Sequence, residues 1–275
     1  MSSNTEPNPI VTKRVVYSLP QLEEVRVDRD HAYRTTDKGA LTLDVYYPPN
    51  AQAGARSPAV VFVTGYADPV ARQLFGCALK DMGSYVSWAQ LTAASEMVAI
   101  TYTNQDPAAD ALAVLRYVRD NAAALSIDET RLGLWSCSGN VPVALSALMQ
   151  EEVLQPLRCA VLAYGYTLDQ DGTGATAEAA RRFGFANPCA RKSVDDLPRE
   201  TPLFVARAGK DQTPGLNEAI DRFIAQCLAR NLPLTVVNHA EGPHAFDVVD
   251  DSPASRAVIQ QILAFLRFNL LRSRL

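Results

Sequence analysis

The sequence predicts an α/β protein with a doubly wound, mostly parallel sheet, because apolar strands alternate with amphipathic helices along most of the chain. Continuous apolar runs are typical of strands that are covered on both faces, as in a parallel sheet. Right-handed crossovers are expected to join such strands. We expect these strands at residues 59–63, 97–102, 131–135, 159–164, 202–206 and 234–237, and helices near 85–94, 107–125, 140–150, 214–227 and 253–270.

The first strands differ from the later ones, because apolar and polar residues alternate in them. This pattern covers residues 25–27, 32–35 and 41–47, and Asp37-Lys38-Gly39 supplies a turn before the last of these stretches. We therefore expect the sheet to begin with an antiparallel pair. The polar, proline-rich residues 1–20 are expected to form an N-terminal arm, which lies on the surface or is disordered and has no chemical role.

The chain of 275 residues shows no internal repeat and no linker, so we expect a single domain over residues 1–275. Residues 165–200 interrupt the alternation with polar, glycine-rich sequence. An irregular stretch of this length inside a compact domain is more often functional than accidental. We expect it to form a short lid-like insertion or a pocket wall.

Composition excludes several classes of function. The net charge of −4 provides no basic surface for nucleic acid and little attraction to an anionic membrane, so a small-molecule substrate or a protein partner is expected. The five cysteines form no CxxC pair and no histidine cluster accompanies them, so neither a metal nor another cofactor is expected. The N-terminus has no apolar run like that of a signal peptide, and nowhere do 18 apolar residues follow one another; we expect a cytoplasmic protein.

Residues 131–140 contain the strongest candidate for chemistry, since an apolar strand runs directly into small residues and then a helix. Such a turn forces its central residue, here Ser138, into a strained backbone conformation that exposes the hydroxyl group. The positions two before and two after that residue are crowded, and glycine usually fills both, giving GxSxG. Here they are Ser136 and Asn140.

Ser138 is the best-fitting nucleophile on steric grounds, although Ser136 and Cys137 compete with it. If Cys137 were the nucleophile, the bulky Trp135 would occupy the crowded position two residues before it. If Ser136 were the nucleophile, Leu134 would occupy that position. A small, polar turn without any chemistry is a further alternative.

A serine nucleophile needs a base, and the sequence offers three histidines. His31 belongs to the antiparallel region, far from the carboxyl ends of the parallel strands. His239 ends the last predicted strand and could be structural. His244 lies in the loop beyond that strand, from which a side chain can reach across the sheet edge, so His244 is preferred.

The acid that orients the base is expected at a neighbouring strand end. Asp211 follows the strand at 202–206, while Asp169 and Asp171, after the preceding strand, are alternatives. The order Ser138, Asp211, His244 matches the order nucleophile, acid, base of one particular fold.

The chain resembles the α/β-hydrolase superfamily, in particular its esterase-like and dienelactone-hydrolase-like members. The resemblance covers nearly everything after about residue 40 and is carried by residues 110–119, 127–138, Ala208–Asp211 and Gly242–Phe246. It implies a sheet of about eight strands and hydrolysis of a small carboxylic ester through an acyl-enzyme. Dienelactone hydrolases use a cysteine nucleophile, and Cys137 is one residue out of place for that role, so their specific activity is not carried over.

The resulting hypothesis is a Ser-His-Asp triad of Ser138, His244 and Asp211. The fold supplies one oxyanion-hole donor from the N–H of Gly139, and the loop after the strand at 59–63 is expected to supply the other from Tyr66. Tyr66 could equally form an aromatic pocket wall. Because Ser136 and Asn140 replace the usual glycines, they could reshape the turn or mark an inactive ligand-binding relative.

Two further expectations concern the reaction and the assembly. A serine peptidase or an acyltransferase would use the same machinery with a different leaving group or acceptor, and both are alternatives to the esterase. Phe265, Phe268 and Leu271, on the outer faces of the C-terminal helix, are the features that favour a homodimer.

Overall fold

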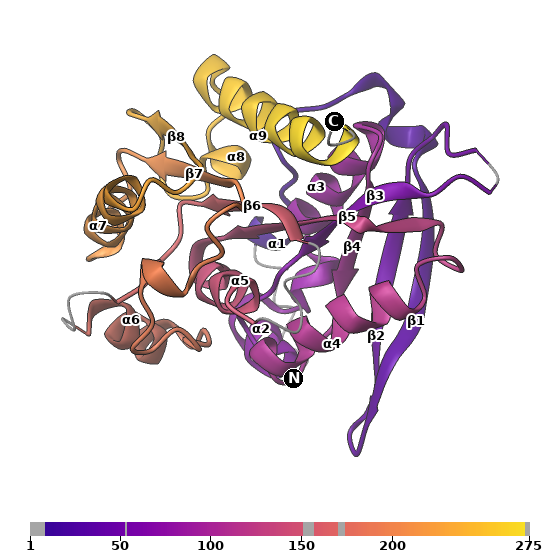
Figure 1. The fold of residues 1–275 in the computed structure, drawn as a ribbon, viewed down its shortest axis with the longest axis horizontal. Coiled ribbons are helices and arrows are strands. Elements are labelled where there is room, and N and C mark those ends of the chain that lie inside the picture. Colours follow the sequence, from indigo (N-terminus) through magenta and orange to yellow (C-terminus); the bar gives the residue numbers. More distant parts are fainter. Residues whose placement is uncertain (1–8, 53, 151–156, 170–173, 273–275) are drawn as a thin grey trace, which may run out of the picture.

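The computed structural model describes residues 9–52, 54–150, 157–169 and 174–272, and its centre is one eight-stranded sheet with helices on both faces (Figure 1). The strand order is β1-β2-β4-β3-β5-β6-β7-β8. β1 pairs antiparallel with β2, β2 pairs antiparallel with β4, and the remaining pairs are parallel. The predicted doubly wound, mostly parallel sheet is therefore confirmed. The strands are β1 (Arg26–Thr36), β2 (Gly39–Tyr47), β3 (Ser57–Phe62), β4 (Val98–Tyr102), β5 (Ile127–Cys137), β6 (Leu157–Ala163), β7 (Leu203–Ala208) and β8 (Leu234–His239).

Two apolar cores lie on the two faces of the sheet, because the central strands bury side chains on both sides. One core includes residues of α4, α5 and α7, and the other includes residues of α3 and α9. The α-helices are α1 (Pro9–Thr12), α2 (Asp68–Phe75), α3 (Gly83–Ala94), α4 (Pro107–Asp120), α5 (Val141–Leu148), α6 (Ala175–Phe183), α7 (Leu216–Ala229), α8 (Phe246–Val249) and α9 (Pro253–Leu271).

The strand order creates a switch point between β3 and β5. After β3 the chain adds β4 on one side, and after β4 it crosses to the other side to add β5. The helices that follow, α3 and α5, consequently pack on opposite faces of the sheet. In open α/β sheets, ligands bind in the crevice outside the carboxyl ends of the strands at such a point. A ligand-binding site is therefore expected at the turns after β3 and β5.

Residues 9–16 of the expected arm lie against α3 and against the chain that follows β8. Val15 is buried, and its N–H donates to Ser87 Oγ of α3 at 2.9 Å. The N–H of Val16 donates to the carbonyl oxygen of Asp247 at 2.8 Å. The N-terminal segment therefore contacts the C-terminal part of the chain.

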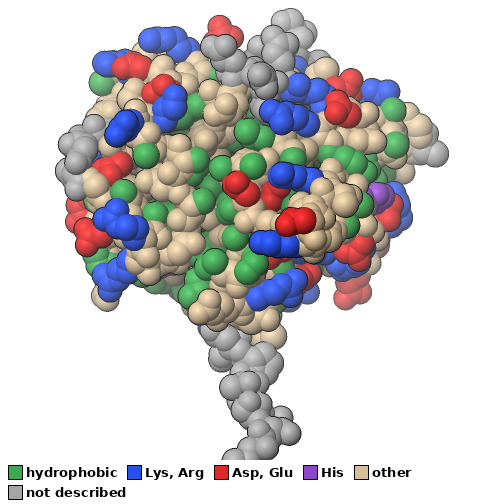
Figure 2. Space-filling model, turned by 90° about the horizontal axis from the view of Figure 1, so that it is seen from below, with side chains coloured by type: hydrophobic (Ala, Val, Ile, Leu, Met, Phe, Trp, Pro, Cys, Tyr) green, Lys and Arg blue, Asp and Glu red, His purple; other side chains and the backbone are tan. Residues whose placement is uncertain are grey.

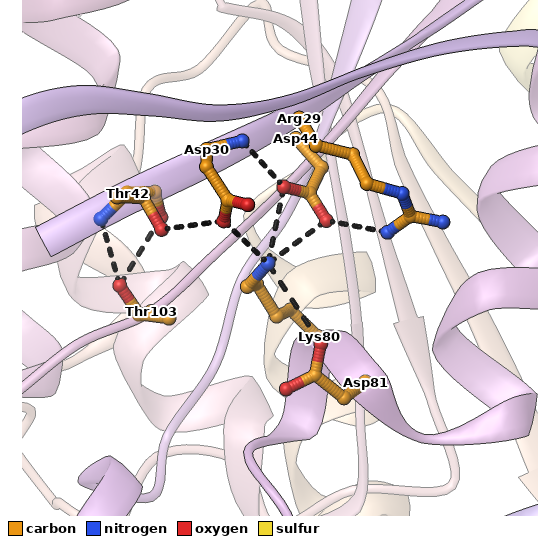
Figure 3. A network of polar contacts seen from close by, with 7 residues as sticks. All are labelled: Arg29, Asp30, Thr42, Asp44, Lys80, Asp81 and Thr103. Atoms are coloured by element: carbon orange, nitrogen blue, oxygen red, sulfur yellow. Dashed lines mark hydrogen bonds and ion pairs between the residues drawn. The ribbon is translucent and has the colours of Figure 1, made fainter.

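A buried ion pair fixes the loop that precedes α3 to the antiparallel pair (Figure 3). Lys80 Nζ lies 2.9 and 3.0 Å from the two carboxylate oxygens of Asp44, which has no exposed surface. Asp44 also accepts from Arg29 at 3.1 Å and from the N–H of Asp30 at 3.0 Å. The short 3-10 helix around Lys80 (Leu79–Asp81) is thereby held against β2.

The surface has no strong charge of one sign on the face that Figure 2 shows, where Lys and Arg side chains alternate with Asp and Glu. No helix of the described ranges is both long and apolar enough to cross a membrane. On α9, Phe265 packs against Phe204 with ring centroids 5.3 Å apart, whereas Phe268 is 57% exposed beneath the guanidinium of Arg272. The homodimer stays a prediction.

Candidate active site

Ser138 occupies the tight turn between β5 and α5, at the switch point of the sheet. Its φ of 52° lies in the left-handed region, which a serine adopts only under strain. The 3-10 turn Ser138–Asn140 follows at once and leads into α5. The structure therefore shows the sharp strand–turn–helix geometry that the sequence predicts for this serine.

The structure brings Ser138, His244 and Asp211 together from three separate loops. Ser138 Oγ lies 2.9 Å from His244 Nε2, and His244 Nδ1 lies 2.5 Å from Asp211 Oδ2. His244 belongs to the loop between β8 and α8, and Asp211 to the loop after β7. An acid at Nδ1 holds the proton on that nitrogen and leaves Nε2 free to accept one from the serine.

Asp211 is held in its ionised form by its neighbours. Burial alone would raise the pKa of its carboxyl group, but hydrogen bonds from His244 and Thr213 outweigh burial and place the pKa below its usual value. The N–H of Thr213 donates to Asp211 Oδ1 at 2.9 Å. The Asp211 side chain has no exposed surface, whereas that of His244 is 35% exposed, so His244 is the accessible member of the pair.

The competing histidines lie elsewhere. His239 is buried, with Nε2 2.9 Å from Ser255 Oγ and 3.3 Å from Asp250 Oδ2, so its contacts are those of a structural residue. His31 lies in β1, with Nε2 3.1 Å from Asp28. As for the alternative acids, Asp169 accepts from the N–H of Gly174 at 3.2 Å, and Asp171 lies outside the described residues.

Among the described residues, neither competing nucleophile is hydrogen-bonded to a histidine. Ser136 is fully buried, and its hydroxyl donates to the carbonyl oxygen of Val161 on β6 at 3.1 Å. Burial raises the pKa of the Cys137 thiol to about 12, which disfavours the reactive thiolate. Of the three adjacent candidates, only Ser138 contacts a histidine.

Gly139 and Tyr66, the predicted oxyanion donors, face each other across the switch point. A methyl group on Gly139 would lie 2.7 Å from Tyr66 Oη, and one on Gly65 would lie 2.3 Å from the carbonyl oxygen of Gly139. The two turns therefore approach as closely as glycine allows. Within the described ranges, neither the Gly139 nor the Tyr66 N–H donates to a protein acceptor, so both could serve a developing negative charge.

Asn140 connects these two turns, a role that sequence reasoning missed. Its Oδ1 accepts from the N–H of Gly65 at 2.6 Å, while Nδ2 donates to Tyr85 Oη at 2.8 Å and to the carbonyl oxygen of Cys137 at 2.9 Å. The residue is only 3% exposed. A buried amide that satisfies both its oxygen and its nitrogen is a structural connector. The signal was a polar residue at a position where glycine is usual.

A cavity of about 210 Å³ opens beside Ser138 and His244. Among its lining residues is Asp247, which sequence reasoning also missed. Its carboxylate accepts from Trp88 Nε1 and from Tyr164 Oη, each at 2.6 Å. Burial raises the pKa of Asp247, although both hydrogen bonds oppose this effect.

Comparison of the sequence with family models gives no match, and no curated protein is significantly similar. Solved structures, in contrast, match over most of the chain. A thermostable esterase from Pseudomonas putida ECU1011 is 17% identical, with 92% of this chain and 85% of that chain covered and a TM-score of 0.70. Esterase 2 of the planctomycete Thermogutta terrifontis with propionate bound is 18% identical, with 93% and 98% covered and a TM-score of 0.67. The chain has the α/β-hydrolase fold.

In an α/β-hydrolase fold, the nucleophile stands on the strand-to-helix turn, and the acid and the histidine follow it in chain order. Ser138, Asp211 and His244 occupy those places in that order. Esterase 2 of Thermogutta terrifontis has also been solved phosphonylated by sarin, and this structure is 18% identical, with 92% of this chain and 99% of that chain covered and a TM-score of 0.66.

Proposed function

We propose that this chain is a serine hydrolase that cleaves small carboxylic esters. The observation that carries the proposal is the hydrogen-bonded series from Ser138 through His244 to Asp211, with the serine in a strained left-handed conformation at the sheet edge. A serine alcohol is a weak nucleophile unless a base takes its proton, and this series supplies both the base and the group that orients it.

The proposed reaction proceeds through an acyl-enzyme. His244 Nε2 accepts the proton of Ser138 as Oγ bonds to the ester carbonyl carbon, and Asp211 stabilises the imidazolium that forms. The N–H groups of Gly139 and Tyr66 stabilise the oxyanion, each contributing about 3 to 4 kcal/mol. His244 then returns the proton to the departing alcohol. Water, deprotonated by His244, cleaves the acyl-enzyme and restores Ser138.

The structural neighbours support an esterase, because the names of both matched proteins identify them as esterases. The narrower assignment to the dienelactone-hydrolase-like branch rests on the sequence motifs at residues 110–119, 127–138, 208–211 and 242–246, and the cytoplasmic location rests on the sequence alone. Both remain parts of the proposal.

The first test is intact-protein mass after treatment with a fluorophosphonate, on the wild type and on Ser138→Ala. We expect one adduct on the wild type and none on the variant, which keeps its fold. Hydrolysis of 4-nitrophenyl acetate should fall at least about 10⁴-fold in the variant. Turnover retained by Ser138→Ala, or a folded wild type that neither reacts with the fluorophosphonate nor hydrolyses the ester, contradicts the proposal.

A further inference from the structure

The cavity beside Ser138 is small. Its volume of about 210 Å³ is below the range of about 300 to 1,000 Å³ that is usual for pockets holding a whole drug-sized ligand. An engineered protein cavity of about 150 Å³ binds benzene. The space therefore suits one part of a substrate, of about the size of one aromatic ring with a short substituent.

Aromatic side chains form a large part of the wall of this cavity. Tyr66, Tyr85, Trp88, Trp135 and Tyr164 line it, together with Met82. Trp135 contacts both Tyr85 and Trp88, with ring centroids 6.0 and 5.2 Å apart. Trp88 and Trp135 are each 1% exposed, so the surrounding protein holds them in place. Such a wall favours a flat or compact apolar group, because rings offer edge and face contacts without side-chain rearrangement.

The electrostatics of the cavity disfavour a charged group. Among the described residues that line it, none is a lysine or an arginine, and Asp247 is the only acidic one. An anionic group would meet this carboxyl group with no lysine or arginine among the described lining residues to compensate it. A cationic group would find both Asp247 oxygens already accepting hydrogen bonds, from Trp88 and Tyr164, so Asp247 is poorly placed to bind it. A buried carboxyl group whose pKa is raised is also a poor counter-ion.

The N-terminal segment also contributes to the wall of the cavity, through Ile10 of α1. This segment is fixed to the elements that carry the cavity. The N–H of Val15 donates to Ser87, between Tyr85 and Trp88 on α3, and the N–H of Val16 donates to Asp247. At Gly83, a methyl group would lie 2.7 Å from the carbonyl oxygens of Thr12 and Lys13, so the two backbones are in direct contact.

We propose that this cavity binds a compact, uncharged group of up to about one aromatic ring from one side of the ester, and that Ile10 sets its upper size. The effect on substrate selection depends on the proposed hydrolase activity of Ser138. Binding of the group in the cavity does not depend on it. Ile10 gives the N-terminal segment a role in substrate selection.

Binding is tested without turnover by the tryptophan fluorescence of Ser138→Ala. The chain contains two tryptophans, and both line the cavity. Benzyl alcohol, benzoate and benzylamine present one ring with no charge, a negative charge and a positive charge. We expect benzyl alcohol to change the fluorescence with a dissociation constant at least about tenfold lower than the other two. Equal affinities for the three compounds, or no saturable change with benzyl alcohol, would overturn the proposal.

Substrate selection is tested by kcat/KM on two ester series. One is 4-nitrophenyl acetate, butyrate, benzoate, octanoate and hemisuccinate, and the other is methyl, benzyl and octyl acetate. If the acyl group enters the cavity, kcat/KM should fall at least about tenfold from 4-nitrophenyl benzoate to 4-nitrophenyl octanoate. If the alcohol group enters it, the same fall should occur from benzyl acetate to octyl acetate. If neither series shows this fall while acetate is hydrolysed, the size limit is wrong but the proposed hydrolase stands.

The role of Ile10 is tested by Ile10→Ala and Ile10→Trp, with Lys13→Ala as the control on the same segment, because the Lys13 side chain is exposed. In the acyl series, Ile10→Ala should raise the ratio of kcat/KM for the octanoate to that for the acetate at least about fivefold. Ile10→Trp should lower the ratio of kcat/KM for the benzoate to that for the acetate by a similar factor. If the alcohol group enters the cavity, the octyl and benzyl acetates are compared with methyl acetate in the same way. Lys13→Ala should leave both ratios as in the wild type. Identical ratios in all four proteins would remove Ile10 from the proposal.

Discussion

The carboxamide oxygen of Asn140 lies 2.6 Å from the backbone nitrogen of Gly65, across the switch point of the sheet. Each residue is the direct neighbour of a proposed oxyanion donor, Gly139 on one side and Tyr66 on the other. The hydrogen bond therefore fixes the separation of the two donors. A glycine at position 140, as in the usual motif, could not make this contact.

Asn140→Ala and Asn140→Gly should each lower kcat about 10- to 100-fold with a much smaller change in KM, because the donors act on the transition state. Affinity for a trifluoromethyl ketone, which forms the oxyanion with Ser138, should fall in parallel. Ser136→Gly is the matched control, since the Ser136 hydroxyl donates to the carbonyl oxygen of Val161 on β6 and not to either donor turn, and its kcat should stay within about threefold of wild type. Wild-type kcat in Asn140→Gly would show that the donors need no such connection.

Asp211→Asn should lower kcat strongly, because the amide can hold the wrong tautomer of His244. The variant should also be less stable than wild type at pH 7, since the lowered pKa of Asp211 contributes stability above its unfolded pKa of about 3.9. That contribution disappears as the pH falls through the folded pKa. Urea unfolding between pH 3 and 7 should therefore show the two proteins converging at the acidic end; a difference independent of pH would contradict this reasoning.

Lys80→Met should reduce the free energy of unfolding by about 3 to 5 kcal/mol, because it leaves the buried carboxylate of Asp44 without its closest cation. Arg256→Met is the control: its pair with Asp251 is exposed and should be worth less than about 1 kcal/mol. Chemical denaturation of the two variants measures the difference. Equal losses would mean that water or Arg29 compensates Asp44 fully.

Tyr164→Phe should cost about 1 to 3 kcal/mol of stability, because it removes one of the two donors to the buried Asp247 carboxyl group. The pKa of Asp247 is already raised, so its neutral form is the one that the fold favours, and losing a donor disfavours the ionised form further. The destabilisation should therefore be larger at pH 8 than at pH 5. Thermal unfolding at both pH values tests the sign.

The order of the elements and the proposed triad could be predicted because both leave local signals. Apolar runs identify the central strands, and Asp211 and His244 each follow a strand end in the order that the fold requires. Strand boundaries are less accurate: β5 begins at Ile127 rather than near Arg131, since the intervening polar residues carry no apolar pattern.

The contributions of Asn140, Asp247 and Ile10 could not be predicted, because each depends on partners far away in the sequence. Asn140 bonds to Gly65, and Asp247 to Trp88, through contacts that no periodicity encodes. Ile10 stands in a segment whose composition is typical of a surface arm. Only the fold reveals that this segment reaches the cavity.

The bond from Val16 to Asp247 joins two residues that lie far apart in the sequence, and Asp247 lines the cavity. Contacts between such distant residues form late, since the loop they close spans most of the protein. During synthesis, the ribosome must release the region around Asp247 before the N-terminal segment can dock. A nascent chain therefore has no finished pocket until the region around Asp247 has left the ribosome.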